Sequence, residues 1–401
     1  MQNVRKLGED TWYIGANDRK ISLFEGVYPL ENGISYNSYV ILDEKTVLMD
    51  TADEAVSRIF MENLAGVLNG RALDIIVINH MEPDHCAALG LVLQKYPEAK
   101  LFGTMQVKNL IAQFHGTDVT DRFTAVKEND TLSTGRHQLR FFTAPMVHWP
   151  EVMVTYDETD HVLYSADAFG LFGALSGNLY ADTCSLWTEG LSEARRYYTN
   201  IVGRYGMQVQ ALLKKASALD ISMICPLHGP VIRRDFGYYI DLYDKWSRYA
   251  YEDNAVAIFY GSIYGGTENA CEILAAHLAE KGIRDIRLYD VARTHFSYLV
   301  AEAFRCQALV FAAPTKDAAL FPPMELLLTE IKHKGLAGRT VGLIENGSWG
   351  PMAGKLMGAY FENLKDIDML SKTVTIRSAM NEAGREELAA MAEEIAGKLL
   401  P

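Results

Sequence analysis

Four potential metal ligands fall within six consecutive positions, in the run His80-Met81-Glu82-Pro83-Asp84-His85. The run directly follows Val77-Ile78-Asn79, where an apolar, strand-like segment ends. Alternate residues of an extended segment point to the same side, so His80, Glu82 and Asp84 can face a common centre. Imidazole and carboxylate groups are common metal ligands, and a single histidine would carry far less weight than this density. The run therefore predicts a metal site.

Three further residues of ligand type come shortly after strand-like segments elsewhere in the chain. They are His148 after Leu139–Thr143, Asp167 after Val162–Ser165, and His228 after Ile221–Cys225. Each could be structural by itself, since an aspartate after a strand is usually part of a turn or a helix cap. Together with His80, Glu82, Asp84 and His85 they make seven possible ligands, enough for two metal ions if one carboxylate bridges them.

A second candidate site begins at a loop of glycines and hydroxyl side chains. The strand-like segment Val256–Tyr260 leads through Gly261 into Ser262-Ile263-Tyr264-Gly265-Gly266-Thr267, and a helical pattern follows. Backbone N–H groups, hydroxyls and a helix N-terminus all favour an anion, so the loop predicts a phosphate site. The loop alone is a weak signal, because an ordinary turn between a strand and a helix can have this composition.

Two more loops strengthen this second prediction. They are Pro314-Thr315-Lys316-Asp317, after the segment Ala308–Ala313, and Asn346-Gly347-Ser348-Trp349-Gly350, after Thr340–Glu345. In a parallel sheet of strand order 2-1-3-4-5, the loops after strands 1, 3 and 4 meet at the switch point, where flavin mononucleotide (FMN) binds in flavodoxin-like folds. Trp349 has a planar face that can stack on the flavin ring system.

The elements that must position these loops change in pattern near residue 250. Before it, short strands alternate with polar loops and a few helices: strands at Tyr36–Leu42, Thr46–Met49, Asp74–Ile78, Leu139–Thr143, Val152–Tyr156 and Val162–Ser165, and helices at Glu54–Leu68, Ala87–Lys95 and Leu191–Ala218. After it, strands and helices alternate regularly: strands at Val256–Tyr260, Ile286–Val291, Ala308–Ala313, Thr340–Glu345 and Thr373–Ile376, and helices at Thr267–Lys281, Pro323–Gly335, Met352–Leu364 and Glu382–Leu399. Parallel neighbours need such crossover helices. We therefore expect an α/β chain of two domains, residues 1–250 and 251–401, the second a doubly wound parallel sheet.

The composition is ordinary for a globular protein but acidic. The 401 residues include 38 Lys and Arg against 51 Asp and Glu, a net charge of −13, which argues against a nucleic-acid partner and an anionic membrane surface. No apolar run approaches the roughly 18 residues of a membrane span, and no secretory signal is visible, so we expect a cytoplasmic protein. No two of the five cysteines are spaced Cys-x-x-Cys, so we expect buried thiols rather than a rubredoxin-type or zinc-ribbon module or a disulfide framework.

The order His-x-Glu-x-Asp-His, then His, Asp and His, resembles the metallo-β-lactamase-like domain of flavodiiron proteins. The spacing is similar too, with 62 residues between His85 and His148, 18 between His148 and Asp167, and 60 between Asp167 and His228. The segment after residue 250 resembles the flavodoxin domain of the same family. It departs from the commonest pattern at Lys316 and Asp317, where an aromatic residue and Asn are frequent, and at Pro351, where a smaller residue is common. The resemblance covers nearly the whole chain and implies a metallo-β-lactamase-like αββα sandwich followed by a flavodoxin-like sheet.

The resemblance also implies the cofactors, which are two irons and one FMN. It assigns His80, Glu82 and His148 to one iron, Asp84, His85 and His228 to the other, and Asp167 to both as a bridge. Family members differ in whether the equivalent of His85 reaches the metal. Zinc hydrolases of the superfamily carry His in place of Glu82, and a hard carboxylate oxygen suits an iron that cycles between Fe(II) and Fe(III).

The implied activity is reductive, with the iron ligands as catalytic residues. Electrons from an external donor (rubredoxin, a flavin reductase or a deazaflavin) pass through FMN to the irons, which reduce dioxygen to water or nitric oxide to nitrous oxide. The family assembles as a head-to-tail homodimer, or a tetramer of two such dimers, with the flavin of one subunit beside the irons of the other. Tyr264 and His295 are conceivable proton sources, although lone residues of these types are more often structural.

Two other functions stay open at this point. One is a zinc hydrolase whose flavodoxin domain serves only for docking or regulation, and Glu82 counts against it. The other is a non-catalytic electron-transfer or redox-sensing flavoprotein with a vestigial metal domain, and the intact set of seven ligands counts against that.

Overall fold

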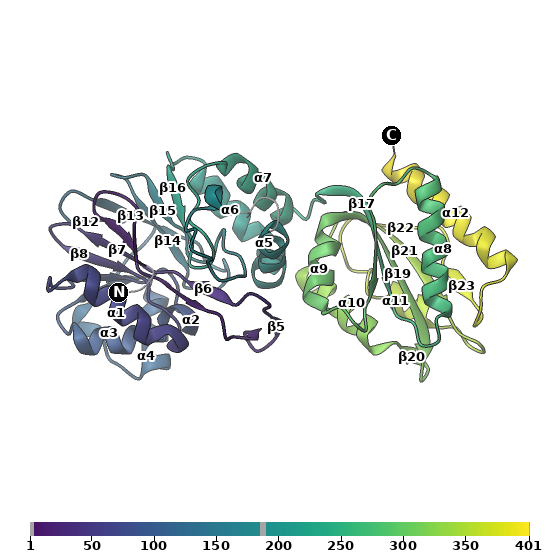
Figure 1. The fold of residues 1–401 in the computed structure, drawn as a ribbon, viewed down its shortest axis with the longest axis horizontal. Helices are drawn as coiled ribbons and strands as arrows, with labels where there is room; N and C mark the ends of the chain where they lie inside the picture. Colours follow the sequence, from purple (N-terminus) through teal and green to yellow (C-terminus); the bar gives the residue numbers. More distant parts are fainter. Residues whose placement is uncertain (1–3, 185–189, 401) are drawn as a thin grey trace. The chain divides into compact units, whose positions relative to one another are not determined.

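The computed structural model describes residues 4–184 and 190–400 and divides the chain into two compact units, Met1–Asp244 and Lys245–Pro401 (Figure 1). The division falls a few residues before the change of pattern seen in the sequence. All five cysteines are free, and four of them are buried. Of the described helices, none is both long enough and apolar enough to cross a membrane.

Unit 1 contains two β-sheets that pack face to face. The first has the order β1-β2-β7-β8-β9-β10-β11, with strands Arg5–Lys6, Thr11–Tyr13, Tyr39–Leu42, Thr46–Met49, Ile75–Val77, Lys100–Gly103 and Phe123–Ala125. The second has the order β12-β13-β14-β15-β16, with strands Thr131–Ser133, Gln138–Thr143, Met153–Asp157, Val162–Tyr164 and Met223–Cys225. Side chains such as Val47 and Met49 of the first sheet and Phe141 and Met153 of the second share one buried core. Two short ribbons, β3 (Ala16–Asp18) with β6 (Ile34–Tyr36) and β4 (Leu23–Phe24) with β5 (Tyr28–Pro29), complete the unit.

The helices of unit 1 lie between or after these strands in the chain. They are α1 (Ser57–Leu68), α2 (Pro83–Cys86), α3 (Leu89–Lys95), α4 (Met105–His115), α5 (Leu191–Tyr197), α6 (Gly206–Ala216) and α7 (Phe236–Ser247), which ends just past the division between the units. Helix α1 shows why these residues are helical: Phe60, Leu64 and Val67 recur at helical spacing and are all buried. Asn69 ends the helix in the left-handed conformation, with φ of 47°.

Unit 2 is a parallel sheet of order β18-β17-β19-β21-β22, with β23 also paired to β21 and the short β20 antiparallel to β19. Its strands are β17 (Asp253–Tyr260), β18 (Ile286–Asp290), β19 (Cys306–Lys316), β20 (Ala319–Leu320), β21 (Arg339–Asn346), β22 (Ile367–Met369) and β23 (Val374–Ile376). Helices α9 (Phe296–Arg305), α10 (Pro322–Lys334) and α11 (Ala353–Gly358) cover one face, and α8 (Gly266–Glu280) and α12 (Glu382–Leu399) cover the other (Figure 1). The sheet is doubly wound, so the carboxyl ends of β17, β19 and β21 lie at one edge.

The predicted fold class is confirmed: a metallo-β-lactamase-like sandwich precedes a flavodoxin-like sheet. Several elements were not predicted. Helix α4 buries only Val107 and Ile111, so its apolar stripe is thin. Helix α7 is rich in tyrosine and tryptophan, which are more typical of strands. The stretch predicted as one helix from Leu191 is interrupted by a π-helical turn at Tyr198–Val202.

Candidate metal centre and flavin cradle

The seven candidate metal ligands come from four segments that follow strands of unit 1, and the structure brings all seven together. His80 and Glu82 follow β9, His148 follows β13, Asp167 follows β15, and His228 follows β16. Asp84 and His85 lie on α2, because Pro83 begins a helical turn instead of continuing the extended loop expected from sequence. The turn separates Asp84 from His80 and Glu82, so the three do not share one centre.

The first group consists of His80, Glu82, His148 and Asp167. Each side chain offers one ligand atom, and these four atoms all lie within 4.8 Å of one another. Glu82 Oε2 lies 3.2 Å from His80 Nε2 and 2.9 Å from His148 Nε2. Asp167 Oδ2 lies 3.3 Å from His80 Nε2 and 3.2 Å from His148 Nε2. Two imidazole nitrogens and two carboxylates thus face one small space.

The second group contains Asp84, His85 and His228, also within 4.8 Å of one another. Asp84 Oδ2 lies 3.3 Å from His85 Nε2 and 3.2 Å from His228 Nε2. The other oxygen of Asp167, Oδ1, lies 3.0 Å from His85 Nε2 and 3.7 Å from His228 Nε2. Asp167 therefore presents one oxygen to each group, the arrangement that a bridging carboxylate needs.

Orphaned polar atoms indicate that these residues fit metal ions. Both oxygens of Asp84, both ring nitrogens of His85, Asp167 Oδ1 and His228 Nε2 are buried and make no hydrogen bond within the described part of the chain. Buried polar atoms almost always have hydrogen-bond partners. So many unpaired atoms in one place indicate a partner that is not a protein group. Nitrogen and carboxylate oxygen in this proportion suit iron.

The backbone around the centre is held by buried polar groups that were not among the predicted site residues. Asp50 accepts hydrogen bonds from the backbone N–H groups of Asn79 and His80, at 2.7 and 3.1 Å, and from Asn79 Nδ2 at 2.7 Å. His228 Nδ1 donates to the backbone carbonyl of Ser35 at 2.8 Å. Asp50 directly follows the strand Thr46–Met49, so the rule that found Asp167 could also have found it.

A third group of ligand-type residues, His137, Asp157 and Asp160, lies elsewhere in unit 1. Here the guanidinium of Arg136 already supplies the positive charge. Its Nη1 lies 2.8 Å from His137 Nε2, and its Nη2 lies 2.5 Å from Asp160 Oδ1. His137 Nδ1 is paired with Asp157 at 2.7 Å. The group is a satisfied ion-pair network.

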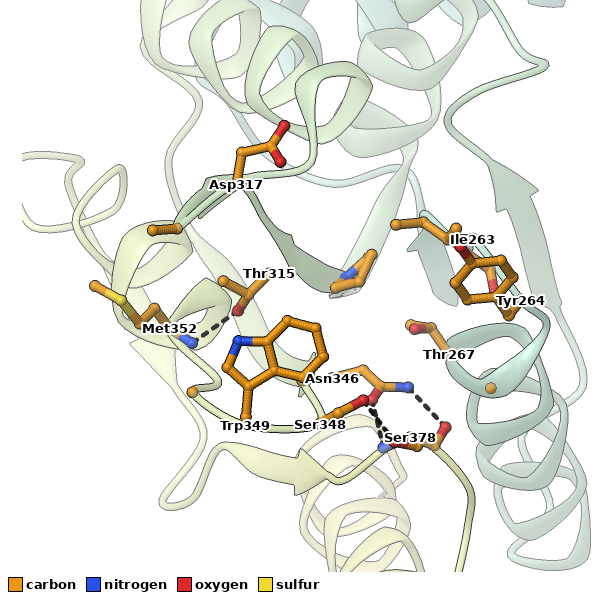
Figure 2. A pocket seen from close by; sticks show the side chains of 16 residues that line it. Ile263, Tyr264, Thr267, Thr315, Asp317, Asn346, Ser348, Trp349, Met352 and Ser378 are labelled. Atoms are coloured by element: carbon orange, nitrogen blue, oxygen red, sulfur yellow. Dashed lines mark hydrogen bonds between the residues drawn. The ribbon is translucent and has the colours of Figure 1, made fainter.

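The three segments predicted as flavin-binding loops line one cavity of about 690 Å³ in unit 2 (Figure 2). Two of them begin within strands: Pro314, Thr315 and Lys316 form the end of β19, which extends beyond the predicted strand, and Asn346 is the last residue of β21. Thirteen of the fifteen predicted residues line the cavity: Ser262, Ile263, Tyr264, Gly266, Thr267, Pro314, Thr315, Asp317, Asn346, Gly347, Ser348, Trp349 and Gly350. Gly265 and Lys316 are not in the lining, whereas Ala318, Met352 and Ser378 are and were not predicted. Ser378 follows β23, at the same edge of the sheet. His295, a conceivable proton source, lines a different cavity and caps α9.

Side-chain hydrogen bonds hold the loops around this cavity in place. Asn346 accepts from the backbone N–H of Ser378 at 3.0 Å and donates to its carbonyl at 3.2 Å (Figure 2). Thr315 Oγ1 accepts from the N–H groups of Met352 and Ala353, at 2.8 and 3.1 Å. A Cβ on Gly266 would lie 2.2 Å from the carbonyl oxygen of Ser378, so only glycine fits there.

Two aromatic side chains flank the opening of the cavity. Trp349 and Tyr264 come from different loops and lie on different sides of it (Figure 2). They are 91% and 98% exposed, so their ring faces are not used by contacts within unit 2. A planar, aromatic ligand carrying a phosphate group matches this combination of open rings and the glycine-rich helix N-terminus at Gly265 and Gly266.

Comparisons with known proteins agree with both halves of this arrangement. Residues 34–229 match the family described as ODP family beta lactamase. The chain is 32% identical over 367 residues to the anaerobic nitric oxide reductase flavorubredoxin of Pectobacterium atrosepticum, and the alignment covers 87% of this chain and 70% of that protein. The rubredoxin oxygen:oxidoreductase of the anaerobe Desulfovibrio gigas superposes with a TM-score of 0.93 at 26% identity, covering 99% of this chain and 98% of that one. A flavoprotein from Thermotoga maritima gives 0.90 at 25% identity, with the same coverage.

The charges in the centre predict how the metal-free protein responds to pH. Burial alone lowers the pKa of His148, but hydrogen bonds to Asp167 and Glu82 outweigh it and raise the pKa to about 9. Protonation of His148 therefore stabilises the fold fully below the unfolded value of about 6.5, and this contribution is lost as the pH rises through about 9. We expect the melting temperature of metal-free protein to fall across this window.

Thermal unfolding between pH 6 and 10, in the presence of a chelator, checks this. His148→Gln should flatten the slope, and His333→Gln, on an exposed part of α10, should leave it unchanged. The same slope in His148→Gln and in the unsubstituted protein would contradict the explanation.

Proposed function

We propose that this chain, which belongs to the flavodiiron protein family of oxidoreductases, reduces nitric oxide, dioxygen or both at a pair of irons. The electrons come from an external donor through FMN. The observation that carries the proposal is the cluster of four imidazoles and three carboxylates in which Asp167 offers one oxygen to each of two groups. The names of the similar proteins, a nitric oxide reductase and a rubredoxin oxygen:oxidoreductase, support the two gases and a rubredoxin-type donor.

The assignment of ligands follows the two groups of side chains. His80, Glu82 and His148 would hold one iron, Asp84, His85 and His228 the other, and Asp167 would bridge them. When bound, the irons supply redox and Lewis-acid chemistry for reducing a diatomic gas, and the flavin supplies an electron relay. The protein's part is to hold the ligands: Asp50 fixes the backbone at His80, and the carbonyl of Ser35 orients His228.

The cavity of unit 2 would hold FMN. Its phosphate would lie at the N-terminus of α8, where Ser262 Oγ accepts from the N–H of Gly265 at 3.1 Å and the loop presents further backbone N–H groups. Trp349 would stack on the ring system. The cavity and the metal ligands belong to different units, and we propose the head-to-tail homodimer, alone or paired into a tetramer, as the assembly that joins them.

Stoichiometry and turnover test the proposal directly. We expect close to two irons and one FMN per chain in protein purified from iron-replete cells. Anaerobically reduced protein, mixed in parallel with dioxygen and with nitric oxide, should be reoxidised by at least one gas with release of water or nitrous oxide. Zinc as the dominant metal, or reoxidation by neither gas, would contradict the proposed function.

Glu82 separates this function from that of a zinc hydrolase. Glu82→His replaces an anionic oxygen by a neutral, bulkier nitrogen donor, so the site loses a negative charge that stabilises Fe(III). Changes among groups that merely support metal ligands cost roughly 10–100-fold in metal affinity, so replacement of a ligand should cost at least about as much. We expect lower iron content, a shift toward zinc and loss of gas reduction, whereas FMN content stays constant because the flavin loops lie in unit 2.

Metal and flavin analysis of the purified variant checks this expectation. Glu62→His, on the exposed face of α1, is the matched control and should change none of the three readouts. Full iron occupancy with unchanged turnover in Glu82→His would show that Glu82 is not an iron ligand.

The homodimer predicts complementation between two inactive variants. Asp167→Ala removes the proposed bridge, and Gly266→Ala places a methyl group against the carbonyl of Ser378 in the flavin cavity. In a mixed dimer, one of the two flavin–metal pairs is intact, so some activity should return after the subunits exchange. Absence of recovery, with subunit exchange demonstrated by differently tagged chains, would argue against electron transfer between subunits.

A further inference from the structure

A buried carboxylate stands behind one of the proposed ligand histidines. His80 Nδ1 lies 2.8 Å from Glu151 Oε1, and both side chains are fully buried. The same oxygen accepts from the backbone N–H of Met81 at 2.9 Å. The backbone carbonyl of Glu151 accepts from Thr104 Oγ1 at 3.0 Å, which fixes its position. His80 Nδ1–H therefore points at Glu151, and Nε2 points at Glu82 and Asp167.

The other histidines of the cluster lack this support. His228 Nδ1 donates to the backbone carbonyl of Ser35, a neutral group. His85 Nδ1 is buried and has no hydrogen-bond partner among the described residues. Within the described part of the chain, a hydrogen bond from a proposed ligand histidine to a carboxylate behind it occurs at His80 alone. The two groups of ligands are thus supported unequally.

Glu151 has one further unusual property. Its second oxygen, Oε2, is buried and has no hydrogen-bond partner in the described residues. A buried carboxylate with an unsatisfied oxygen is costly for the fold, so a purely structural role would be served better by a neutral amide. The negative charge of Glu151 is therefore expected to have a function. The imidazole of His80 is the side chain that this carboxylate contacts.

We propose that Glu151 is a positioning residue that makes the two metal positions unequal, an inference that rests on the proposed metal pair. Its oxygen fixes the tautomer of His80 so that Nε2 is free to donate to a metal. Its charge makes that imidazole a stronger donor. The position formed by His80, Glu82 and His148 gains this support, and the position formed by Asp84, His85 and His228 does not.

The test measures metal affinity, using Zn²⁺ alone as the probe. Metal-free wild type, Glu151→Gln and Glu151→Leu are titrated with Zn²⁺ in competition with a coloured chelator, which resolves two binding constants per chain. Gln keeps an acceptor for His80 Nδ1–H but removes the charge, and Leu removes both. We expect one of the two constants to weaken, by roughly 10–100-fold for Leu and by less for Gln, while the other stays unchanged. Anomalous diffraction at limiting Zn²⁺ should show metal lost from the His80 position.

Glu128→Gln is the matched control, because Glu128 accepts a hydrogen bond from the N–H of Thr143 but lies on the surface. It should leave both constants unchanged. Unchanged constants in Glu151→Gln and Glu151→Leu, or equal weakening of both positions, would overturn the inference. If Glu151→Leu does not fold, the near-isosteric Gln variant decides by itself. One weakened binding constant supports the inference, and two unchanged constants overturn it. The readout of this test is metal affinity and not turnover. A protein that binds two metals but reduces neither gas would therefore contradict the proposed function and leave the inference about Glu151 intact.

Discussion

The structure depends on placing three carboxylates next to one another in a buried space. Glu82 lies beside His80 and His148, and Asp84 lies beside His85 and His228. Asp167 is almost completely buried and lies within a few ångströms of all four imidazoles. Burial raises the pKa of Asp167, and the neighbouring histidines, His85 and His80 first, more than reverse this and hold the pKa well below its usual range. Without positive charge at the centre, the repulsion between these groups would oppose folding. The cluster is therefore stable only with protons or metal ions between its members.

The two sheets of unit 1 supply the rigidity that such a cluster requires. Each ligand loop begins where a buried strand ends, so backbone hydrogen bonds of the sheets fix the ligand positions to within a short stretch of chain. Buried side chains then tie the loops to the strands: Thr155 of β14 donates to Asn79 Oδ1 at 2.7 Å, and Asn79 in turn donates to Asp50. Ser165 Oγ, at the end of β15, donates to the carbonyl of Ala168 and shapes the loop that carries Asp167. Unit 2 uses the same principle for the predicted flavin site, whose lining residues lie at one edge of a parallel sheet.

The sequence predicted the parts of this arrangement that depend on local pattern. The sequence alone indicates where strands end and which residue types follow them. It also shows the regular alternation of strands and helices in unit 2. What the sequence could not provide is the direction in which each side chain points. Asp84 belongs to a different group from Glu82 because Pro83 begins a helical turn between them. Gly266 is required by the carbonyl of Ser378, more than 100 positions away, and Glu151 matters only because the fold of unit 1 brings it behind His80. Such contacts are set by the packing of distant strands and leave no periodic signal.

Charge connects the proposed ligands with the residue behind them. Two bound divalent metal ions would bring four positive charges into this buried space. The carboxylates of Glu82, Asp84 and Asp167 carry three negative charges, and Glu151 adds a further one behind His80. Asp50 accepts hydrogen bonds from three N–H groups, but burial outweighs them and raises its pKa. The positive charge of bound metals would offset these buried carboxylates and lower the cost of burying them. Oxidation of a bound metal would add positive charge. That charge would be least unfavourable where carboxylates are most concentrated, at the position with Glu82 in front of His80 and Glu151 behind it. A histidine in place of Glu82 would remove that advantage and leave a redox-inactive metal such as zinc as the better match.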